Sequence, residues 1–220
     1  MKKLLSVKTY QIFPDENGFL YAAKEINGEP PIFKRYDLTY MKSSPIKRSV
    51  YLQKKFGRKS EAFANCFTDC LSCDSCAFSG GKTAVLFPDG DIGWFDGDGR
   101  LLKEGKLQYK GSPAQCILPD GNDAFWSVIP QENTILKIST VTERMIIRVG
   151  GGENSPFNHP SHIYKYDANL FVCDKEGFVK RVSLSDFRVS NYYRFDEPVY
   201  QYLRVGNSEV VCLESGVYLL

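Results

Sequence analysis

Four cysteines that lie close together have the clearest potential for chemistry in this sequence. They follow the spacing C-x3-C-x2-C-x2-C within eleven residues, at Cys66, Cys70, Cys73 and Cys76. Thiolates are preferred ligands of zinc and of iron–sulfur clusters, and thiols three residues apart in one loop can converge on a single centre. One expectation is therefore a zinc or iron–sulfur site in the loop 66–76, with Asp69 and Asp74 either as extra ligands or as plain loop residues.

The same four thiols have two other interpretations. They can form a disulfide or redox pair, or they can be inert, as small buried hydrophobic residues and loop thiols commonly are. The remaining cysteines lie in apolar segments with β-branched or aromatic neighbours, so we expect buried, unreactive thiols at Cys116, Cys173 and Cys212.

Residues 41–60 form a basic segment within the first part of the chain. Residues 41–60 contain seven Lys and Arg and no Asp or Glu, and Tyr40, Tyr51 and Phe56 are interleaved with them. Such a patch can contact phosphates while aromatic rings stack on bases, which makes a nucleic acid or another polyanion a candidate partner. A solvated outer strand is the commoner explanation, and the net charge of +2 argues against dedicated nucleic-acid binding. The candidate polyanion contacts are Lys54, Lys55, Arg58 and Lys59.

The two histidines, His159 and His162, stand three residues apart and are a candidate metal or proton-shuttle pair. A structural role is the expected one, because His159 precedes Pro160 in a turn. No nucleophile is paired with a base at a recognisable spacing, so the sequence supports no enzymatic reaction.

A repeating pair of strands organises the chain around these residues. Short strands open near residues 9, 63, 113, 160 and 198, and each leads through a polar turn to an apolar second strand. Repeats of this size with four strands each are typical of a β-propeller. The predicted units are 9–62, 63–112, 113–159, 160–197 and, closed by an N-terminal strand from residues 1–8, 198–220. In this frame Cys66 occupies the inward position of an inner strand that Ile12, Cys116 and Ile163 occupy elsewhere.

One unit resembles a known repeat. It contains a glycine run at 150–152, the sequence FNHP at 157–160, the strand LFVCD at 170–174 and FVKRV at 178–182. This unit resembles the NHL repeat, and the resemblance covers about one unit in five. It implies a propeller fold and a tendency to serve as a binding platform, and it assigns no catalytic residue.

Composition is that of one globular all-β domain spanning residues 1–220. The chain is 43% hydrophobic and 25% charged, and its Asp-Gly steps suit tight turns between short strands. The best helical candidate, residues 49–64, lacks a clean apolar stripe. Residues 1–7 are too short in apolar length for a signal peptide, and no segment approaches a membrane span. We expect a cytoplasmic monomer that does not associate with membranes.

These observations predict an all-β protein, a five-bladed β-propeller whose last blade is closed by the N-terminal strand. The expected function is non-catalytic: a binding module, with a protein partner held by loops at one end of the central channel. Aromatic residues make up 14% of the chain and suit such an interface. The alternatives are a metal-binding protein that uses the Cys66–Cys76 loop and a small propeller enzyme with a pocket in the channel.

Overall fold

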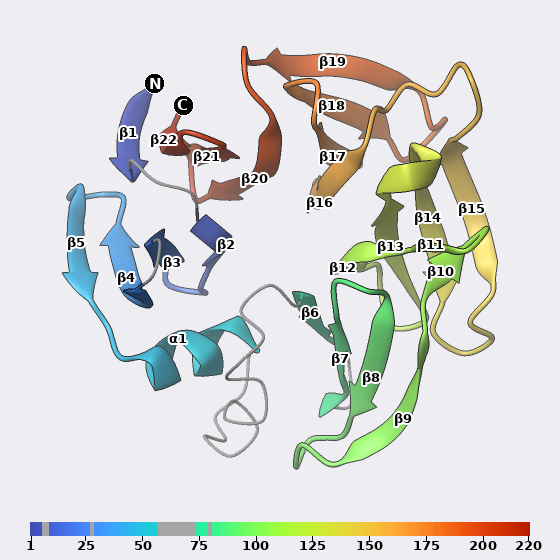
Figure 1. Ribbon diagram of the computed structural model, residues 1–220, viewed down its shortest axis with the longest axis horizontal. Coiled ribbons are helices and arrows are strands. Elements are labelled where there is room, and N and C mark those ends of the chain that lie inside the picture. The colour runs from blue at the N-terminus through green and yellow to red at the C-terminus, as the bar shows by residue number, and fades with distance from the viewer. Residues whose placement is uncertain (6–8, 27–28, 57–73, 79–80) are drawn as a thin grey trace.

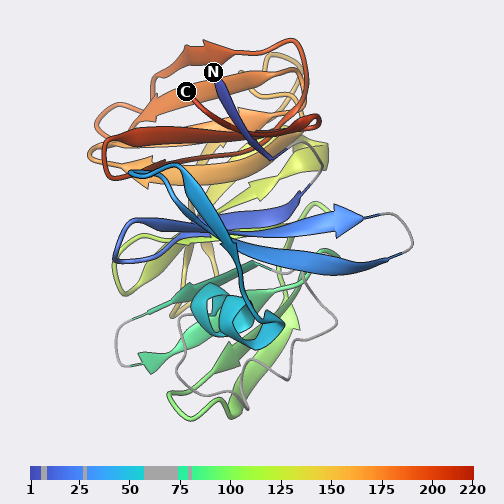
Figure 2. The ribbon, with the colours of Figure 1, turned by 90° about the vertical axis from the view of Figure 1, so that its left-hand side faces the viewer.

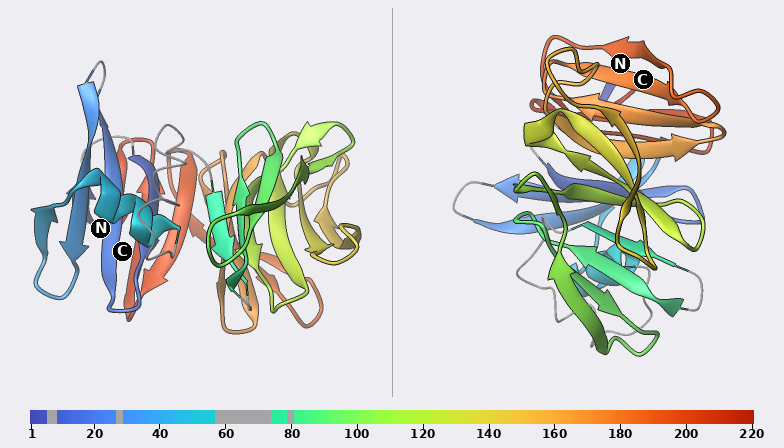
Figure 3. Two further views of the ribbon diagram at one scale, coloured as in Figure 1. Left: turned by 90° about the horizontal axis from the view of Figure 1, so that it is seen from below. Right: turned by 90° about the vertical axis from the view of Figure 1, so that its right-hand side faces the viewer.

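Five four-stranded antiparallel sheets surround a central axis in the computed structural model, which describes residues 1–5, 9–26, 29–56, 74–78 and 81–220 (Figure 1). Seen from the side, the strands run along the short axis of the molecule (Figure 3). The chain is therefore a five-bladed β-propeller, as the sequence predicts.

The first three blades follow the order of the chain. Blade 1 comprises β2 (Thr9–Pro14), β3 (Phe19–Ile26), β4 (Glu29–Asp37) and β5 (Lys42–Pro45). Blade 2 comprises β6 (Asp74–Ala77), β7 (Thr83–Leu86), β8 (Asp91–Phe95) and β9 (Leu101–Lys106). Blade 3 comprises β12 (Gln115–Pro119), β13 (Ala124–Ile129), β14 (Thr134–Ser139) and β15 (Met145–Gly150). A small hairpin, β10 (Gln108–Tyr109) and β11 (Ser112–Pro113), joins blades 2 and 3.

Blade 5 is completed by a strand from the other end of the chain. Blade 4 comprises β16 (Pro160–Tyr166), β17 (Asn169–Asp174), β18 (Phe178–Ser183) and β19 (Val189–Arg194). Blade 5 comprises β20 (Val199–Val205), β21 (Ser208–Leu213) and β22 (Gly216–Leu219), and its outer strand is β1 (Lys2–Leu5), antiparallel to β22. The two termini consequently lie side by side (Figure 1). The predicted closure by the N-terminal strand is confirmed.

A glycine permits this closure. Gly216 has a φ of +146°, and a Cβ built on it would lie 2.0 Å from the carbonyl oxygen of Leu5. No other residue fits there, because any side chain at this position would collide with the backbone of β1.

Within the described ranges the core consists of five apolar clusters, each between two neighbouring blades. The second strand of each blade faces two of these clusters, because successive side chains point to opposite faces of a sheet. In β17, Leu170 and Val172 pack toward blade 3, while Phe171 and Cys173 pack toward blade 5. This two-sided burial explains why the second strands are continuously apolar in the sequence.

A helix fills the seam between blades 1 and 2. Helix α1 (Arg48–Lys55) buries Tyr51 and Leu52 in the cluster that joins β3 and β4 to Val85 of β7. Figure 2 shows it in front, beside the blue strands of blade 1 and the green strands of blade 2. The hydroxyl of Tyr51 donates to the backbone carbonyl oxygen of Gln11 in β2 at 3.0 Å. The hydroxyl of Ser75 in β6 donates to the backbone carbonyl oxygen of Lys55 at 3.1 Å. The helix is thus bonded to both inner strands. Among the described residues, no helix is long and apolar enough to cross a membrane.

The described part of the second blade begins with β6. The strand that pairs with β7 on the channel side is β6, with Asp74 opposite Leu86. The interpretation that placed Cys66 at the inward position of an inner strand concerns a residue outside the described part of the chain, within which β6 is the strand on the channel side. The expected strand around residues 63–67 lies outside the described residues.

Candidate functional site

One side chain from the inner strand of each blade meets at the channel axis. These five residues, here called the channel ring, are Gln11, Asp74, Cys116, His162 and Gln201, and they line both cavities on the axis. The start-side cavity, where the inner strands begin, has a volume of about 270 Å³; the end-side cavity has about 150 Å³. The channel ring is therefore the constriction between the two cavities.

Asp74 connects three blades. Its Oδ1 accepts a hydrogen bond of 2.7 Å from Nε2 of Gln11 in blade 1. Its Oδ2 accepts one of 2.7 Å from the backbone N–H of Ile117 in blade 3. The backbone N–H of Ser75 adds a third bond at 2.9 Å. A carboxylate near the middle of a protein is tolerated when its lone pairs are used in this way.

Gln201 connects blade 5 to both of its neighbours. The backbone N–H of Ile12 donates to Oε1 of Gln201 at 2.8 Å, and Nε2 of Gln201 donates to the carbonyl oxygen of Ile12 at 2.9 Å. This pair of bonds fixes which end of the amide is oxygen. The same Nε2 lies 3.2 Å from Nε2 of His162 in blade 4.

Cys116 completes the circle between blades 3 and 4. Its Sγ lies 3.9 Å from the carbonyl oxygen of Ile163. Cys116 is at an irregularity in the pairing of β12 with β13 and has a φ of +59°. The hydroxyl of Ser127 stabilises this conformation by donating to the Cys116 carbonyl at 2.7 Å. Every neighbouring pair of blades is thus joined through the channel ring.

The hydrogen bond from Gln201 determines the tautomer of His162. An amide nitrogen only donates, so Nε2 of His162 must accept and the proton of the neutral ring resides on Nδ1. Burial lowers the pKa of His162 to about 4, while the charge of Asp74 acts in the opposite direction. Protonation of Nε2 would also place two donors face to face. His162 is therefore neutral near pH 7.

Two buried polar atoms of the channel ring have no hydrogen-bond partner among the described residues. They are Nδ1 of His162 and Oε1 of Gln11. The first carries a proton and is a donor. The second is an acceptor, because the Nε2 of the same amide is bonded to Asp74. Unpaired buried polar groups are unfavourable by about 1–3 kcal/mol each, so they mark a place where a ligand gains binding energy.

The geometry of the channel ring suits hydrogen bonding better than proton transfer. His162 has one nitrogen bonded to Gln201 and the other protonated, which leaves no lone pair for a general base. Burial, followed by the charge of Asp74, raises the pKa of the Cys116 thiol well above its usual value. A thiol with a raised pKa is a poor nucleophile.

Most of the predicted cysteine site cannot be placed. Cys66, Cys70 and Cys73 lie outside the described residues; Cys76 is in β6, but its side chain is also outside them. Within the described ranges, no group of three or more His, Cys, Asp or Glu is arranged to hold a metal ion. Asp74 belongs to the channel ring. The buried thiols expected at Cys116, Cys173 and Cys212 are confirmed.

The predicted polyanion contacts are only partly described. Lys54 forms ion pairs with Asp15 at 3.4 Å and with Glu16 at 3.3 Å. Lys55 is buried in the seam between the blades. Arg58 and Lys59 lie outside the described residues. Polyanion binding stays a prediction.

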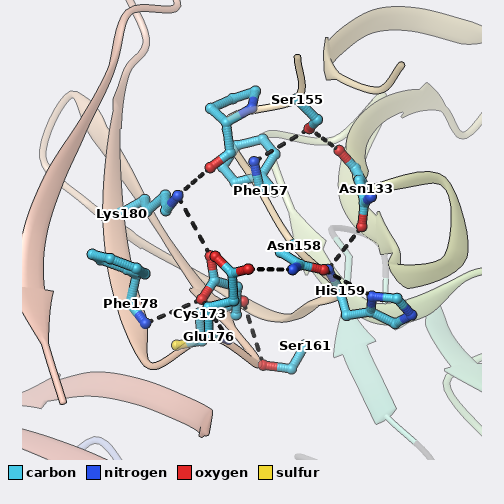
Figure 4. Close-up of polar contacts among 12 residues, drawn as sticks. Asn133, Ser155, Phe157, Asn158, His159, Ser161, Cys173, Glu176, Phe178 and Lys180 are labelled. Atoms are coloured by element: carbon cyan, nitrogen blue, oxygen red, sulfur yellow. Dashed lines mark hydrogen bonds and ion pairs between the residues drawn. The ribbon is translucent and has the colours of Figure 1, made fainter. Parts of the chain in front are cut away.

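The two histidines do not form a pair. His159 is exposed in the connection between blades 3 and 4, where its backbone N–H donates to Oδ1 of Asn133 at 2.8 Å and its Nδ1 lies 3.0 Å from Oδ1 of Asn158 (Figure 4). Gly150 in the preceding glycine run has a φ of +82°, and a Cβ there would lie 2.8 Å from the Asn133 carbonyl. The NHL-like loop therefore has a structural basis, and only His162 reaches the channel.

Sequence reasoning missed Gln11 and Gln201 and assigned Asp74 to a loop. One signal was present. Gln201 follows Pro198 at the same distance as Cys116 follows Pro113 and as Ile163 follows Pro160. An amide at that position, between apolar neighbours, indicates a buried polar contact.

Comparison with known proteins identifies the architecture. Neither the models of known protein families nor the curated protein sequences contain a match to this chain. Among solved structures, the WD40 β-propeller domain of Doa1 is 11% identical with a TM-score of 0.57, and covers 94% of this chain and 73% of its own. A streptogramin B lyase is 12% identical with a TM-score of 0.51, covering 98% and 69%. The computationally designed Ika8 protein is 10% identical with a TM-score of 0.51, covering 96% and 70%. These similarities show a shared β-propeller fold.

Proposed function

We propose that the protein is a non-catalytic binding module that holds a protein partner at the start-side mouth of its channel. The observation that carries this proposal is the pair of unpaired buried atoms in the channel ring, Nδ1 of His162 and Oε1 of Gln11. A group that the partner inserts into the start-side cavity satisfies both atoms and gains the energy that they lack.

The start-side cavity favours a protein side chain as the inserted group. Its volume of about 270 Å³ lies below the range of roughly 300–1,000 Å³ that is typical of pockets for whole small molecules. All five blades contribute to its lining, which includes Phe87, Pro88, Lys175 and Tyr200 near the mouth. An aromatic residue and an exposed cation beside a deep polar pocket are features of protein interfaces.

Chemistry at the same site is the less favoured alternative. The fold is shared with a streptogramin B lyase, and the channel ring contains a histidine, a cysteine and an aspartate. However, His162 offers no lone pair, Cys116 is held as a thiol, and three N–H groups already donate to the Asp74 carboxylate, so hydrogen bonding rather than proton transfer is the best-supported use of the ring. Binding requires only the hydrogen-bonding groups that are present.

Affinity capture with matched variants tests the proposal. The bait proteins are the wild type, Lys175→Glu and Tyr200→Ala at the mouth, and Arg188→Glu on the outer side of blade 4, where the Arg188 side chain is 88% exposed. We expect the wild type and Arg188→Glu to retain the same partner, and both mouth variants to lose most of it. Unchanged melting temperatures show that the mouth variants are folded. Equal capture by all four baits would refute binding at this mouth.

A further inference from the structure

We propose that the channel ring is a binding site for a primary carboxamide, which the side chain of an Asn or Gln residue of the partner supplies. This inference rests on the binding function proposed above and specifies the chemical group that it recognises. It follows from the fixed direction of each hydrogen bond in the channel ring.

The donor of the site is fixed by the backbone of blade 1. Ile12 holds the amide of Gln201 in one orientation through two hydrogen bonds of 2.8 and 2.9 Å. Gln201 in turn donates to Nε2 of His162, which places the imidazole proton on Nδ1. The unpaired Nδ1 of His162 therefore presents an N–H group and requires an acceptor from the ligand.

The acceptors of the site are fixed by Asp74. Its carboxylate orients Gln11 through the bond from Nε2, so that Oε1 of Gln11 is the end of the amide left unpaired. Three N–H groups already donate to the Asp74 carboxylate, and its remaining lone pair adds a second acceptor beside Gln11. This side of the channel ring requires donors from the ligand.

A primary carboxamide matches both requirements. Its carbonyl oxygen accepts from Nδ1 of His162, and its two N–H groups donate to Gln11 and Asp74. A carboxylate would place lone pairs against Gln11 and a negative charge beside Asp74. An ammonium group has no lone pair for His162. Discrimination of this kind is strong because the wrong ligand leaves a buried polar group unpaired.

The start-side cavity also accommodates the carbon stem of such a side chain. Leu86, Phe87, Pro88 and Tyr200 line it above the channel ring, and the end-side cavity beyond has only about 150 Å³. A side chain that enters from the start side therefore reaches the channel ring with its polar end.

Three probes of matched size test the inference on the wild-type protein, without any variant. Propionamide, propionate and propylammonium are each titrated at pH 7 while the ring nitrogens of His162 and the side-chain amide of Gln11 are followed by NMR. We expect saturable shifts of both residues with propionamide and weaker or no shifts with the two charged probes. A charged probe that binds more tightly overturns the inference. Absence of saturable shifts with propionamide, as expected if the channel ring holds only water or serves only to join the blades, overturns it as well.

A variant then assigns the acceptor. Gln11→Met preserves the length of the side chain and removes both Oε1 and the Nε2 that donates to Asp74, and we expect propionamide to bind about tenfold more weakly, the effect of about 1.4 kcal/mol. Gln108→Met, at an exposed position of β10, is the control and leaves binding unchanged.

The propionamide titration and the capture experiment can fail independently of each other. Partner capture that depends on the mouth, without propionamide binding, refutes only the carboxamide; propionamide binding without a partner at the mouth refutes only the protein-binding function.

Discussion

The side-chain amide of Gln201 pairs with the backbone of Ile12 as a neighbouring peptide group would, although the two residues are 189 positions apart in the sequence. This contact joins the last blade to the first at the channel axis. On the outside of blade 5, the pairing of β1 with β22 joins the two ends of the chain at a second place. The ring of blades is therefore closed both at the channel axis and at the outer edge of blade 5.

We predict that Gln201→Met lowers the free energy of unfolding by about 3 kcal/mol. The substitution leaves the N–H and C=O of Ile12 buried without partners, and each such group is unfavourable by about 1–3 kcal/mol. Urea denaturation followed by tryptophan fluorescence measures the effect. Gln108→Met, which alters an exposed residue, should change stability by less than about 0.5 kcal/mol. Equal stability of the two variants would show that the inner closure contributes little.

NMR of the histidine rings will show His162 as the Nδ1–H tautomer at pH 7. The ring should remain neutral down to about pH 4, because burial lowers its pKa to about 4. An Nε2–H tautomer at pH 7 would contradict the assigned hydrogen bond from Gln201.

The same histidine makes stability depend on pH. The folded protein binds the His162 proton less readily than the unfolded chain, whose histidine pKa is near 6.5. The stability that the neutral His162 ring confers is therefore fully present above about pH 6.5. The free energy of unfolding decreases by roughly 2–3 kcal/mol as the pH falls toward 4. Chemical denaturation at a series of pH values checks this, and His162→Met should flatten the dependence in that window.

Asp120 stabilises the interface of blades 3 and 4, and this stabilisation is lost at a lower pH than that of His162. It bonds Lys137 at 2.7 Å and the indole Nε1 of Trp126 at 3.0 Å, and it also pairs with Lys165 of blade 4. Burial opposes ionisation, but the two lysines hold the pKa of Asp120 to about 2, against an ordinary 3.8. The stabilisation is present above pH 4 and is lost as the pH falls toward 2.

We accordingly expect Asp120→Asn to cost about 2 kcal/mol at neutral pH, where each pKa unit corresponds to about 1.4 kcal/mol. Below pH 2 the difference from the wild type should disappear. Asp186→Asn is the control, since the Asp186 side chain is 46% exposed beside Arg188. A constant difference across the pH range would mean that the ion pairs are not its cause.

The Gly216→Ala substitution tests the closure of blade 5 by β1. Gly216→Ala places a Cβ 2.0 Å from the Leu5 carbonyl, so β1 must detach and expose the buried Leu5. We expect a loss of about 2–4 kcal/mol, similar to a large-to-small core substitution, and a melting temperature close to that of a variant lacking residues 1–8. Gly105→Ala, whose nearest neighbour would be 4.0 Å away, should have little effect. An unchanged melting temperature after truncation would argue against this role of β1.

The cysteine loop stays a prediction with a direct measurement. If Cys70, Cys73 and Cys76 are ligands, protein purified without oxygen contains stoichiometric zinc or iron, and Cys73→Ser releases it. Cys212→Ala alters a buried thiol of β21 and should retain the metal. Native protein without metal, in which all four thiols of the loop react with an alkylating reagent, would leave inert thiols as the explanation.

The blades were predictable from sequence because local patterns encode them. Apolar second strands such as β17 and the turns that flank them recur along the chain, and the short last unit indicated that a strand from the N-terminus was needed. The channel ring was not predictable in the same way. Gln11 and Asp74 are 63 residues apart, and their contact depends on how the blades are arranged around the axis. Asp74 also stands in a polar segment that resembles a loop. The burial of its carboxylate is explained by three N–H groups that donate to it, and two of these come from other blades.

Helix α1 gives the channel a connection to the outer surface. The helix separates blades 1 and 2, and through Tyr51 and Lys55 it is bonded to the strands that carry Gln11 and Asp74. The two strands that carry these acceptors are consequently each bonded to an element at the periphery of the molecule. A shift of α1 away from the seam would break both hydrogen bonds, and the inner strands on either side of the Gln11–Asp74 contact would lose their support from the rim.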